Sequence, residues 1–291
     1  MILFPNAKIN IGLRVLRKRP DGYHDIESLM VPIGWHDILE IVPAQDGAGS
    51  FNIVGEDTLR LSSDADNLVI KAVRAVEKYI GRSLPPLDIY LSKIVPTGAG
   101  LGGGSSDASF AIRGVNEVCS LGLDDEEMAR IAAGVGADCP FFIYNRPMLA
   151  QGIGEILTPV EMPALDKLWI LVVKPHTESV STAAAYGGIT PAELPAGVSL
   201  AGFASLSADC WAREKEMVND FELPVFALRP SIGAVKERLA AGGALFTAMS
   251  GSGASVFALY NDVKMAECAA EDFTGCDIFV GSLSSSGVAE R

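Results

Sequence analysis

The sequence predicts a mixed α/β (α+β) fold with two domains. Segments with the two-residue period of strands alternate with segments of helical period along the 291 residues. The composition, 49% hydrophobic and 20% charged, is that of an ordered globular chain with enough apolar side chains for a core. Residues 147–166 carry three prolines and no clear period, so we place the boundary there, between domains 1–160 and 161–291.

The first part of the chain predicts strands and one helix. Residues 8–15 alternate between polar and apolar side chains, which indicates a half-buried strand with Lys8 and Asn10 together on its polar face. The next expected elements are a turn at 19–22, extended stretches at 26–33 and 37–42, a helix at 67–79 and a strand at 87–95.

A glycine-rich loop and two helices come next. The second of these helices begins at Asp124, where Glu127 stands at the spacing of a capping-box partner. The apolar face of the first helix consists of Ala108, Ala111, Ile112, Val115 and Cys119. Beyond residue 160 the sequence predicts a strand at 168–174, a Ser/Thr/Ala/Gly/Pro-rich stretch at 177–205, and then helices and strands in alternation.

Charge and cysteine content exclude several classes of protein. With 23 Lys and Arg against 36 Asp and Glu, the net charge of −13 disfavours nucleic-acid binding, which needs a basic face. The chain has no apolar run long enough for a membrane helix, and its N-terminus lacks the pattern of a signal peptide. Five cysteines without a C-x-x-C pair fit a reduced compartment. We therefore expect a cytoplasmic protein that binds neither nucleic acid nor membrane.

The glycine-rich loop carries the strongest functional signal. It has five glycines in seven positions between an expected strand and an expected helix, so its backbone N–H groups can approach a ligand closely. The helix start adds free N–H donors and a positive dipole end, which together make an anion site. The predicted phosphate loop consists of Pro96, Thr97, Gly98, Ala99, Gly100, Leu101, Gly102, Gly103, Gly104, Ser105 and Ser106, with both serine hydroxyls expected at the helix mouth.

Other nucleotide-binding motifs fit this loop less well. Gly98, Gly100 and Gly103 match G-x-G-x-x-G formally, but the acidic residue at the required distance, Asp124, is expected to cap a helix. No lysine follows the glycines as in a Walker A motif, and protein-kinase signatures are absent. A phosphate loop of another type is favoured, and a dehydrogenase remains a distant alternative.

Several motifs give the chain a resemblance to a known superfamily. PTGAGLGGGSSDA resembles the second motif of the galactokinase, homoserine kinase, mevalonate kinase and phosphomevalonate kinase (GHMP) superfamily. PNAKIN at residues 5–10 resembles the first motif, and MSGSGA at 249–254 resembles the third. Within the superfamily, RPDGYHDIES, GADCPFF, QGIGEILTPV and SGSGASVFAL narrow the resemblance to the 4-diphosphocytidyl-2-C-methyl-D-erythritol kinase family.

The resemblance implies both a fold and a reaction. The fold would be an N-terminal α/β domain and a ferredoxin-like C-terminal domain, with the active site in the cleft between them. The γ-phosphoryl group of ATP would pass to the 2-hydroxyl of the methylerythritol moiety, a step of the non-mevalonate route to isoprenoid precursors. Mg²⁺ is expected as well, because ATP chemistry generally uses it. The ligands would be ATP and a small cytidyl substrate, and the sequence leaves both a monomer and a homodimer open.

Lys8 and Asp138 are the catalytic residues that the resemblance implies. From the residues alone, a strand lysine is usually solvated and an aspartate in the turn GADCP usually caps backbone N–H groups. Together the two side chains make chemical sense. A carboxylate can orient a sugar hydroxyl and accept its proton, while an ammonium favours the ionised carboxylate and offsets charge on the transferring phosphoryl group.

The resemblance also implies residues on the substrate side. Tyr23 and His24 would stack on and hydrogen-bond the cytosine ring, with Tyr186 on the other side of the base. The remaining expected site residues are Asn10 and Thr182 for the substrate and Gly251, Ser252 and Gly253 in the third motif. No residue is assigned to the metal, and His36 and His176 are expected to be structural.

Besides the distant dehydrogenase, two alternatives to this kinase remain open. The first is another small-molecule kinase of the superfamily, such as a mevalonate or homoserine kinase. The motifs GYH and GADCPFF disfavour it. The second is a non-catalytic ligand sensor that kept the fold. The presence of both Lys8 and Asp138 disfavours it.

Overall fold

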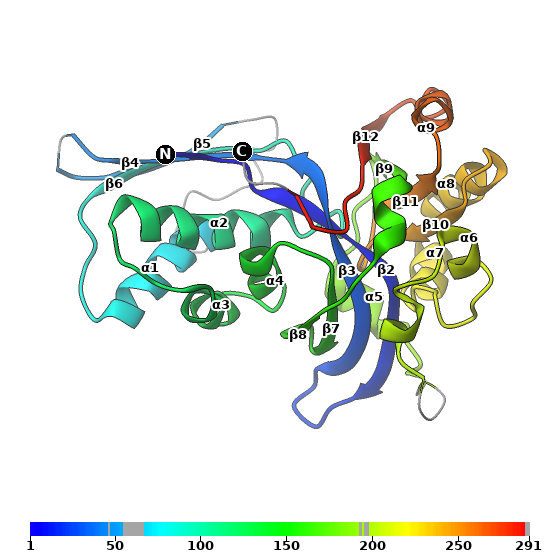
Figure 1. Cartoon of the computed structure of the whole chain (residues 1–291), viewed down its shortest axis with the longest axis horizontal. Helices are drawn as coiled ribbons and strands as arrows, with labels where there is room; N and C mark the ends of the chain where they lie inside the picture. The colour runs from blue at the N-terminus through cyan, green and yellow to red at the C-terminus, as the bar shows by residue number, and fades with distance from the viewer. Residues whose placement is uncertain (46, 55–66, 192–193, 195–197, 289–291) are drawn as a thin grey trace.

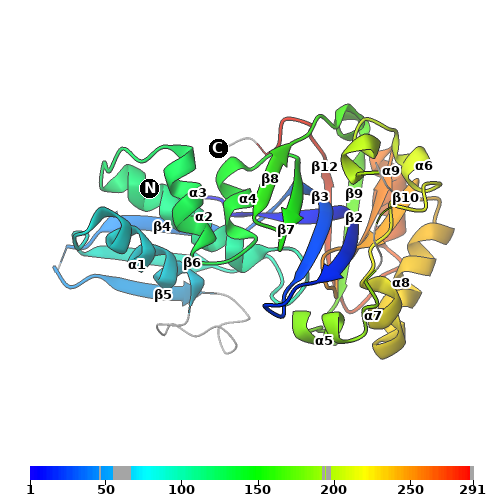
Figure 2. The ribbon, with the colours of Figure 1, turned by 90° about the horizontal axis from the view of Figure 1, so that it is seen from below.

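The computed structural model describes residues 1–45, 47–54, 67–191, 194 and 198–288. Within these residues the strands form three four-stranded sheets. The N-terminal sheet has the order β1-β4-β6-β5, the central sheet β2-β3-β7-β8 and the C-terminal sheet β10-β11-β9-β12. Figures 1 and 2 show the N-terminal sheet and its helices at one end of the molecule and the C-terminal sheet at the other.

The strands are β1 (Ile2–Leu3), β2 (Asn6–Lys18), β3 (His24–His36), β4 (Ile38–Pro43), β5 (Ser50–Val54), β6 (Leu87–Ser92), β7 (Met148–Gly152), β8 (Ile156–Pro159), β9 (Trp169–Pro175), β10 (Phe246–Met249), β11 (Val256–Tyr260) and β12 (Cys276–Ser282). The helices are α1 (Leu68–Ile80), α2 (Gly103–Val118), α3 (Asp125–Ala133), α4 (Cys139–Tyr144), α5 (Thr182–Gly187), α6 (Ala208–Trp211), α7 (Glu222–Leu228), α8 (Pro230–Ala241) and α9 (Val263–Ala270). None of the described helices is long and apolar enough to cross a membrane.

The helices of the N-terminal half lie on one side of the N-terminal sheet (Figure 1). Their apolar faces pack against strand residues such as Leu39 and Ile41 in one buried cluster. Asn67 caps α1 by accepting a hydrogen bond from the backbone N–H of Val69, at 2.9 Å. The expected capping box at the start of α3 is also present, with Asp124 and Glu127 each accepting from the other's backbone N–H.

The long β2–β3 hairpin lies between the two ends of the molecule (Figure 1). The expectation that β2 is half-buried is wrong, because Lys8 and Asn10 are only 4% and 0% exposed. The expectation of one continuous apolar face is also wrong. The register with β3 shifts between Ile11 and Leu13, and Gly12 has a φ of +77°, a left-handed value that favours glycine. This bulge turns Leu13 to the face of β2 that carries Lys8 and Asn10.

A short hairpin, β7–β8, occupies part of the stretch in which we expected no regular structure. β7 pairs with β3 from Met148 to Gly152, and β8 pairs with β7. Strands of five and four residues are too short to show a clear period, and the turn between them, residues 153–155, contains Gly154. The hairpin completes the central sheet, so it extends the N-terminal half up to Pro159.

The C-terminal half has the expected ferredoxin-like topology. The order of elements is β9, α8, β10, β11, α9 and β12, and the antiparallel sheet order β10-β11-β9-β12 is that of a split β-α-β motif. The C-terminal sheet shares a core with the hairpin, since Ile9 and Ile170 belong to the same buried cluster. Trp35 on β3 also stacks on Phe279 of β12, with 5.5 Å between ring centroids.

Candidate active site

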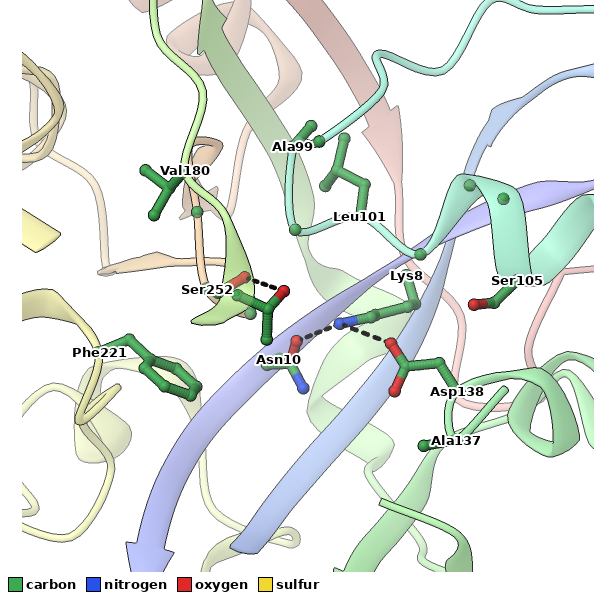
Figure 3. Close-up of a pocket in the computed structure, with 18 of the residues that line it drawn as sticks. Lys8, Asn10, Ala99, Leu101, Ser105, Ala137, Asp138, Val180, Phe221 and Ser252 are labelled. Atoms are coloured by element: carbon green, nitrogen blue, oxygen red, sulfur yellow. Dashed lines mark hydrogen bonds and ion pairs between the residues drawn. The ribbon is translucent and has the colours of Figure 1, made fainter. Parts of the chain in front are cut away.

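A cleft of about 880 Å³ gathers most of the sequence-predicted site residues. It lies where the hairpin, the start of α2, the loop before α4 and the C-terminal half meet (Figure 3). The predicted residues that line it are Lys8, Asn10, Tyr23, His24, residues 96–105, Asp138, Thr182, Tyr186, Gly251, Ser252 and Gly253. Ser106 is the exception.

Lys8 is held rigidly at the bottom of this cleft. Its backbone N–H donates to the carbonyl of Leu101, so β2 is tied directly to the predicted phosphate loop. Its ammonium lies 2.6 Å from Oδ1 of Asn10 and 3.8 Å from Oδ2 of Asp138, and in Figure 3 the three side chains point toward one another. Burial lowers the pKa of Lys8 from its usual value, and Asp138 offsets part of this effect.

Asp138 stands at the N-cap position of α4 but does not act as a cap. Its side chain makes no capping hydrogen bond, so the usual role of a turn aspartate does not apply here. The side chain is 36% exposed, in contrast to 5% for that of Lys8. The carboxylate is therefore open to the cleft while its ion-pair partner is buried, which is the arrangement needed to meet a hydroxyl group.

The predicted phosphate loop runs directly into α2. Helix α2 begins at Gly103, and its N-cap residue, Gly102, has a φ of +71° and no side chain to cap the first turn. The backbone N–H groups of that turn therefore have no side-chain cap, at the positive end of the helix dipole. Ser105 faces the cleft, as expected. Ser106 does not, because it lies inside the helix with 0% exposure, and its hydroxyl has no hydrogen-bond partner among the described residues.

The third motif packs directly against this loop. The hydroxyl of Ser250 donates to the carbonyl of Gly100, at 2.9 Å, and the backbone N–H of Ser255 donates to the carbonyl of Ala99, at 3.1 Å. A Cβ atom on Gly100 would lie 2.0 Å from the carbonyl oxygen of Ser250. Glycine at this position is thus required by the contact between the two motifs as well as by its φ of +75°.

Replacing Gly100 by alanine should destabilise the protein much more than the same change at Gly104. We expect Gly100→Ala to cost about 3 kcal/mol, from a left-handed φ and from overpacking against backbone. Gly104 lies within α2, where a Cβ would meet only Leu68 at 3.5 Å, so Gly104→Ala should stabilise the protein by roughly 0.5–1 kcal/mol. Urea unfolding of both variants measures the difference, and equal stabilities would contradict this account of the loop.

The aromatic side chains on the substrate side do not form an open slot. The rings of His24 and Tyr186 stack on each other, with centroids 4.6 Å apart and an interplanar angle of 13°. Tyr186 also contacts the edge of Phe221, and Tyr23 is 60% exposed at the rim of the cleft. Stacked rings in contact stand about 4.5–7 Å apart, so a third ring does not fit between His24 and Tyr186 in this conformation. Burial, with a smaller effect of Asp138, raises the pKa of Tyr186 to about 12, which keeps its phenol neutral.

Sequence reasoning missed a buried ion cluster beside the loop, and its Lys93 also lines the cleft. Lys93 pairs with both Asp37 and Asp107, and Asp37 also accepts hydrogen bonds from the backbone N–H groups of Ile94 and Val95. Burial lowers the pKa of Lys93, but the two carboxylates outweigh it and hold that pKa above its usual value. Burial also raises the pKa of Asp107, to about 8. These contacts fix the strand end from which the loop starts.

Asn219 is a second missed residue, and it supports the third motif. It is 2% exposed, and its amide group donates to the carbonyls of Met249 and Gly251 at 2.6 and 2.8 Å. Its Oδ1 atom accepts from the backbone N–H of Phe221 at 2.9 Å. A single asparagine in an irregular stretch gives no periodic signal. Its role is visible only in the folded chain, where its side chain contacts a motif about 30 residues away.

The other histidines make local contacts. His36 hydrogen-bonds the carbonyl of Gly34 through Nδ1, and His176 lies 3.1 Å from Asp277 on the surface. Over the described part of the chain, no group of three or more His, Cys, Asp or Glu side chains could hold a metal ion.

Comparisons with known proteins agree with this geometry. The family model of the GHMP kinases N terminal domain matches residues 67–146, and that of the GHMP kinases C terminal domain matches residues 200–271. The 4-diphosphocytidyl-2-C-methyl-D-erythritol kinase of Parabacteroides distasonis is 44% identical over 285 residues, which cover 98% of this chain and 100% of the relative. The enzyme of the same name from Geobacter metallireducens is 38% identical and covers 92% of each chain.

Solved structures show the same likeness. A crystal structure of 4-(cytidine 5'-diphospho)-2C-methyl-D-erythritol kinase superposes with a TM-score of 0.74 at 30% identity, over 94% of each chain. Homoserine kinase from Cytophaga hutchinsonii superposes with a TM-score of 0.72 over 100% of this chain and 97% of its own, but at 19% identity it is similar in fold alone.

Proposed function

Because this chain belongs to the GHMP kinases, and is therefore a kinase that uses ATP, we propose that it phosphorylates 4-diphosphocytidyl-2-C-methyl-D-erythritol on its 2-hydroxyl. The products are the 2-phosphate and ADP, in the cytoplasmic, non-mevalonate synthesis of isoprenoid precursors. The observation that carries the proposal is the ion pair of Lys8 and Asp138, which faces the same cleft as the glycine loop. The relatives' names supply the acceptor.

The predicted phosphate loop is suited to the triphosphate of ATP. Side chains are absent where the glycines line the cleft, and α2 directs its uncapped first turn to the same space. The third motif, including Ser252, forms the opposite wall, where Ser252 lies 3.2 Å from the hydroxyl of Thr182. We propose that Mg²⁺ enters with the nucleotide, since phosphate and water oxygens supply most of its ligands at sites of this kind.

Asp138 and Lys8 have different roles in the transfer to the acceptor. The Asp138 carboxylate orients the 2-hydroxyl and accepts its proton as the new O–P bond forms and the bond from the γ-phosphorus to ADP breaks. The buried Lys8 ammonium, 3.8 Å from Asp138, offsets negative charge that would otherwise build up beside the carboxylate. Asn10 places Lys8 and lines the cleft at the same point.

We propose that the cytosine base binds at Tyr23, His24 and Tyr186, and that Tyr186 moves off His24 to admit it. Base stacking on an aromatic ring contributes about 1–3 kcal/mol, so His24→Ala and Tyr186→Ala should each raise KM for the cytidyl substrate about tenfold or more. Neither change should alter KM for ATP, because neither side chain belongs to the predicted phosphate loop. Initial-rate kinetics with each substrate varied in turn measure both constants. Unchanged KM for the cytidyl substrate in both variants would place the base elsewhere.

We also propose that the two domains divide near residue 160. The central sheet ends with β8 at Pro159, and the next strand, β9, begins the C-terminal sheet at Trp169. The shared buried cluster that contains Ile9 and Ile170 supports a tight association of the two.

A panel of acceptors tests the proposed function. ATP consumption is measured with diphosphocytidyl-methylerythritol, methylerythritol phosphate, mevalonate, homoserine and galactose. We expect turnover with the first alone, because a site built around the polar edge of a base rejects acceptors that leave its groups unpaired. Turnover with mevalonate or homoserine would support another kinase of the family, and turnover with none would support a ligand sensor.

A further inference from the structure

We propose that Ser28 is a positioning residue for catalysis, because it holds the side-chain amide of Asn10 in the one orientation that presents a carbonyl oxygen to Lys8. The inference rests on the proposed function only in taking Lys8 as catalytic. The hydrogen-bond chain itself stands on the geometry of the central hairpin.

Three buried side chains form a continuous chain of hydrogen bonds across β2 and β3. The amide nitrogen of Asn10 donates to the hydroxyl of Ser28 at 2.8 Å, and that hydroxyl donates to the backbone carbonyl of Gly12 at 2.8 Å. At the other end, Lys8 donates to Oδ1 of Asn10 at 2.6 Å. Asn10 and Ser28 are both 0% exposed, so water does not supply alternative partners to them.

The bulge in β2 provides the end point of the chain. Gly12 is the extra residue between Ile11, which pairs with Leu29, and Leu13, which pairs with Ser28. Its carbonyl group is therefore not needed for a regular ladder bond at this point and accepts from Ser28 instead.

The number of donors and acceptors then fixes the orientation of the Asn10 side-chain amide. A serine hydroxyl has one hydrogen, and Ser28 directs it to Gly12. Toward Asn10 the hydroxyl can only accept, so the NH₂ group of the amide must face Ser28 and the carbonyl oxygen must face Lys8. The reversed amide would put a donor against the ammonium and an acceptor against a hydroxyl whose hydrogen is already used.

The charged surroundings of Lys8 show what this orientation achieves. The carboxylate of Asp138 is its ion-pair partner, and the neutral phenol of Tyr186 lies near that carboxylate. Lys93 lines the same cleft, and it pairs with Asp37 and Asp107. Asn10 is therefore the neutral group that supports the protonated form of the buried Lys8 next to Asp138.

The test compares Ser28→Ala with Ser28→Thr, which keeps the hydroxyl, and with Glu27→Gln as the matched control. Glu27 is the preceding residue of β3, is 4% exposed and bonds to Leu200 and Gln151, away from the cleft. We expect Ser28→Ala to lower kcat about tenfold or more, since misplacing a catalytic group by 1 Å can cost about a hundredfold. KM for ATP should stay as in the wild type. The Ser28→Thr variant should retain most of the wild-type kcat.

NMR titration of the Lys8 ammonium in the free protein gives a readout that does not depend on the acceptor. Its midpoint should move to lower pH in Ser28→Ala and stay in place in Glu27→Gln, because only the first change removes the support of the charged form. An unmoved midpoint together with wild-type kcat in Ser28→Ala would overturn the proposal, as would equal effects of Ser28→Ala and Glu27→Gln. A wild-type protein inactive on the cytidyl substrate would refute the proposed function and leave this titration result standing.

Discussion

Asp138→Asn should lower kcat at least a hundredfold while ATP and the acceptor still bind. The amide keeps the size of the carboxylate and its hydrogen bond to a hydroxyl, but it cannot accept a proton, and a positioned acid or base contributes about 10²–10⁴-fold. The fold should be unaffected, because Asp138 caps no backbone group of α4. Steady-state kinetics and nucleotide-binding titrations separate the two effects.

Asp124→Asn is the matched control for this variant. Asp124 also occupies an N-cap position, but its side chain does cap α3, and it lies outside the cleft. Asparagine caps helices about as well as aspartate, so this change should leave both stability and kcat near wild type. Turnover near wild type in Asp138→Asn would remove Asp138 from the mechanism.

Replacing Lys8 by methionine should also lower kcat by about a hundredfold or more, the usual loss when one preorganised group that stabilises transition-state charge is removed. Methionine fills the buried space of the lysine stem, so the loss reports the ammonium rather than a cavity. The double variant with Asp138→Asn should lose little more than either single variant, because groups that act as a unit are not additive. Kinetics of the three variants measure this coupling.

Lys174→Met controls for the burial of a lysine. Lys174 lies on β9, is 6% exposed and does not line the cleft, so its replacement should leave kcat unchanged.

The pH dependence of activity should also reflect Lys8. Because burial lowers the pKa of Lys8, wild-type activity should fall on the alkaline side at a lower pH than an ordinary lysine would give, and Lys8→Met should lack this alkaline decrease. Fully additive losses in the double variant would mean that Lys8 and Asp138 act separately.

Local patterns predicted much of the fold. The helix at 67–79 and the capping box at Asp124 depend on neighbouring residues only, and both are present. The strand expected at 87–95 ends at Ser92, because Ile94 and Val95 bond to Asp37 rather than to a neighbouring strand. The ferredoxin-like half followed from the resemblance, which carried a topology that no single segment encodes.

What the sequence did not reveal depends on contacts between distant segments. The bulge at Gly12 moves Leu13 to the other face of β2. In the sequence, however, a lone glycine does not interrupt the alternation of polar and apolar residues, so the bulge is not visible there. The direct stacking of His24 on Tyr186 joins residues from the two halves of the chain, so no motif could show whether their rings touch or stand apart. Ser106 does not line the cleft because α2 already begins at Gly103, which places this serine inside the helix and buries it.

The contact between Gly100 and Ser250 joins residues 150 positions apart, and it bears on how this enzyme can be divided or recombined. A fragment that ends at the domain boundary would keep every glycine of the loop but lose the backbone that shapes it. Chimeras between relatives should therefore inherit both partners from the same parent, since a larger residue at 100 in one half meets the carbonyl of 250 in the other. The contact between the predicted phosphate loop and the third motif thus resembles an interface between two subunits, and substitutions on its two sides have to be compatible with each other.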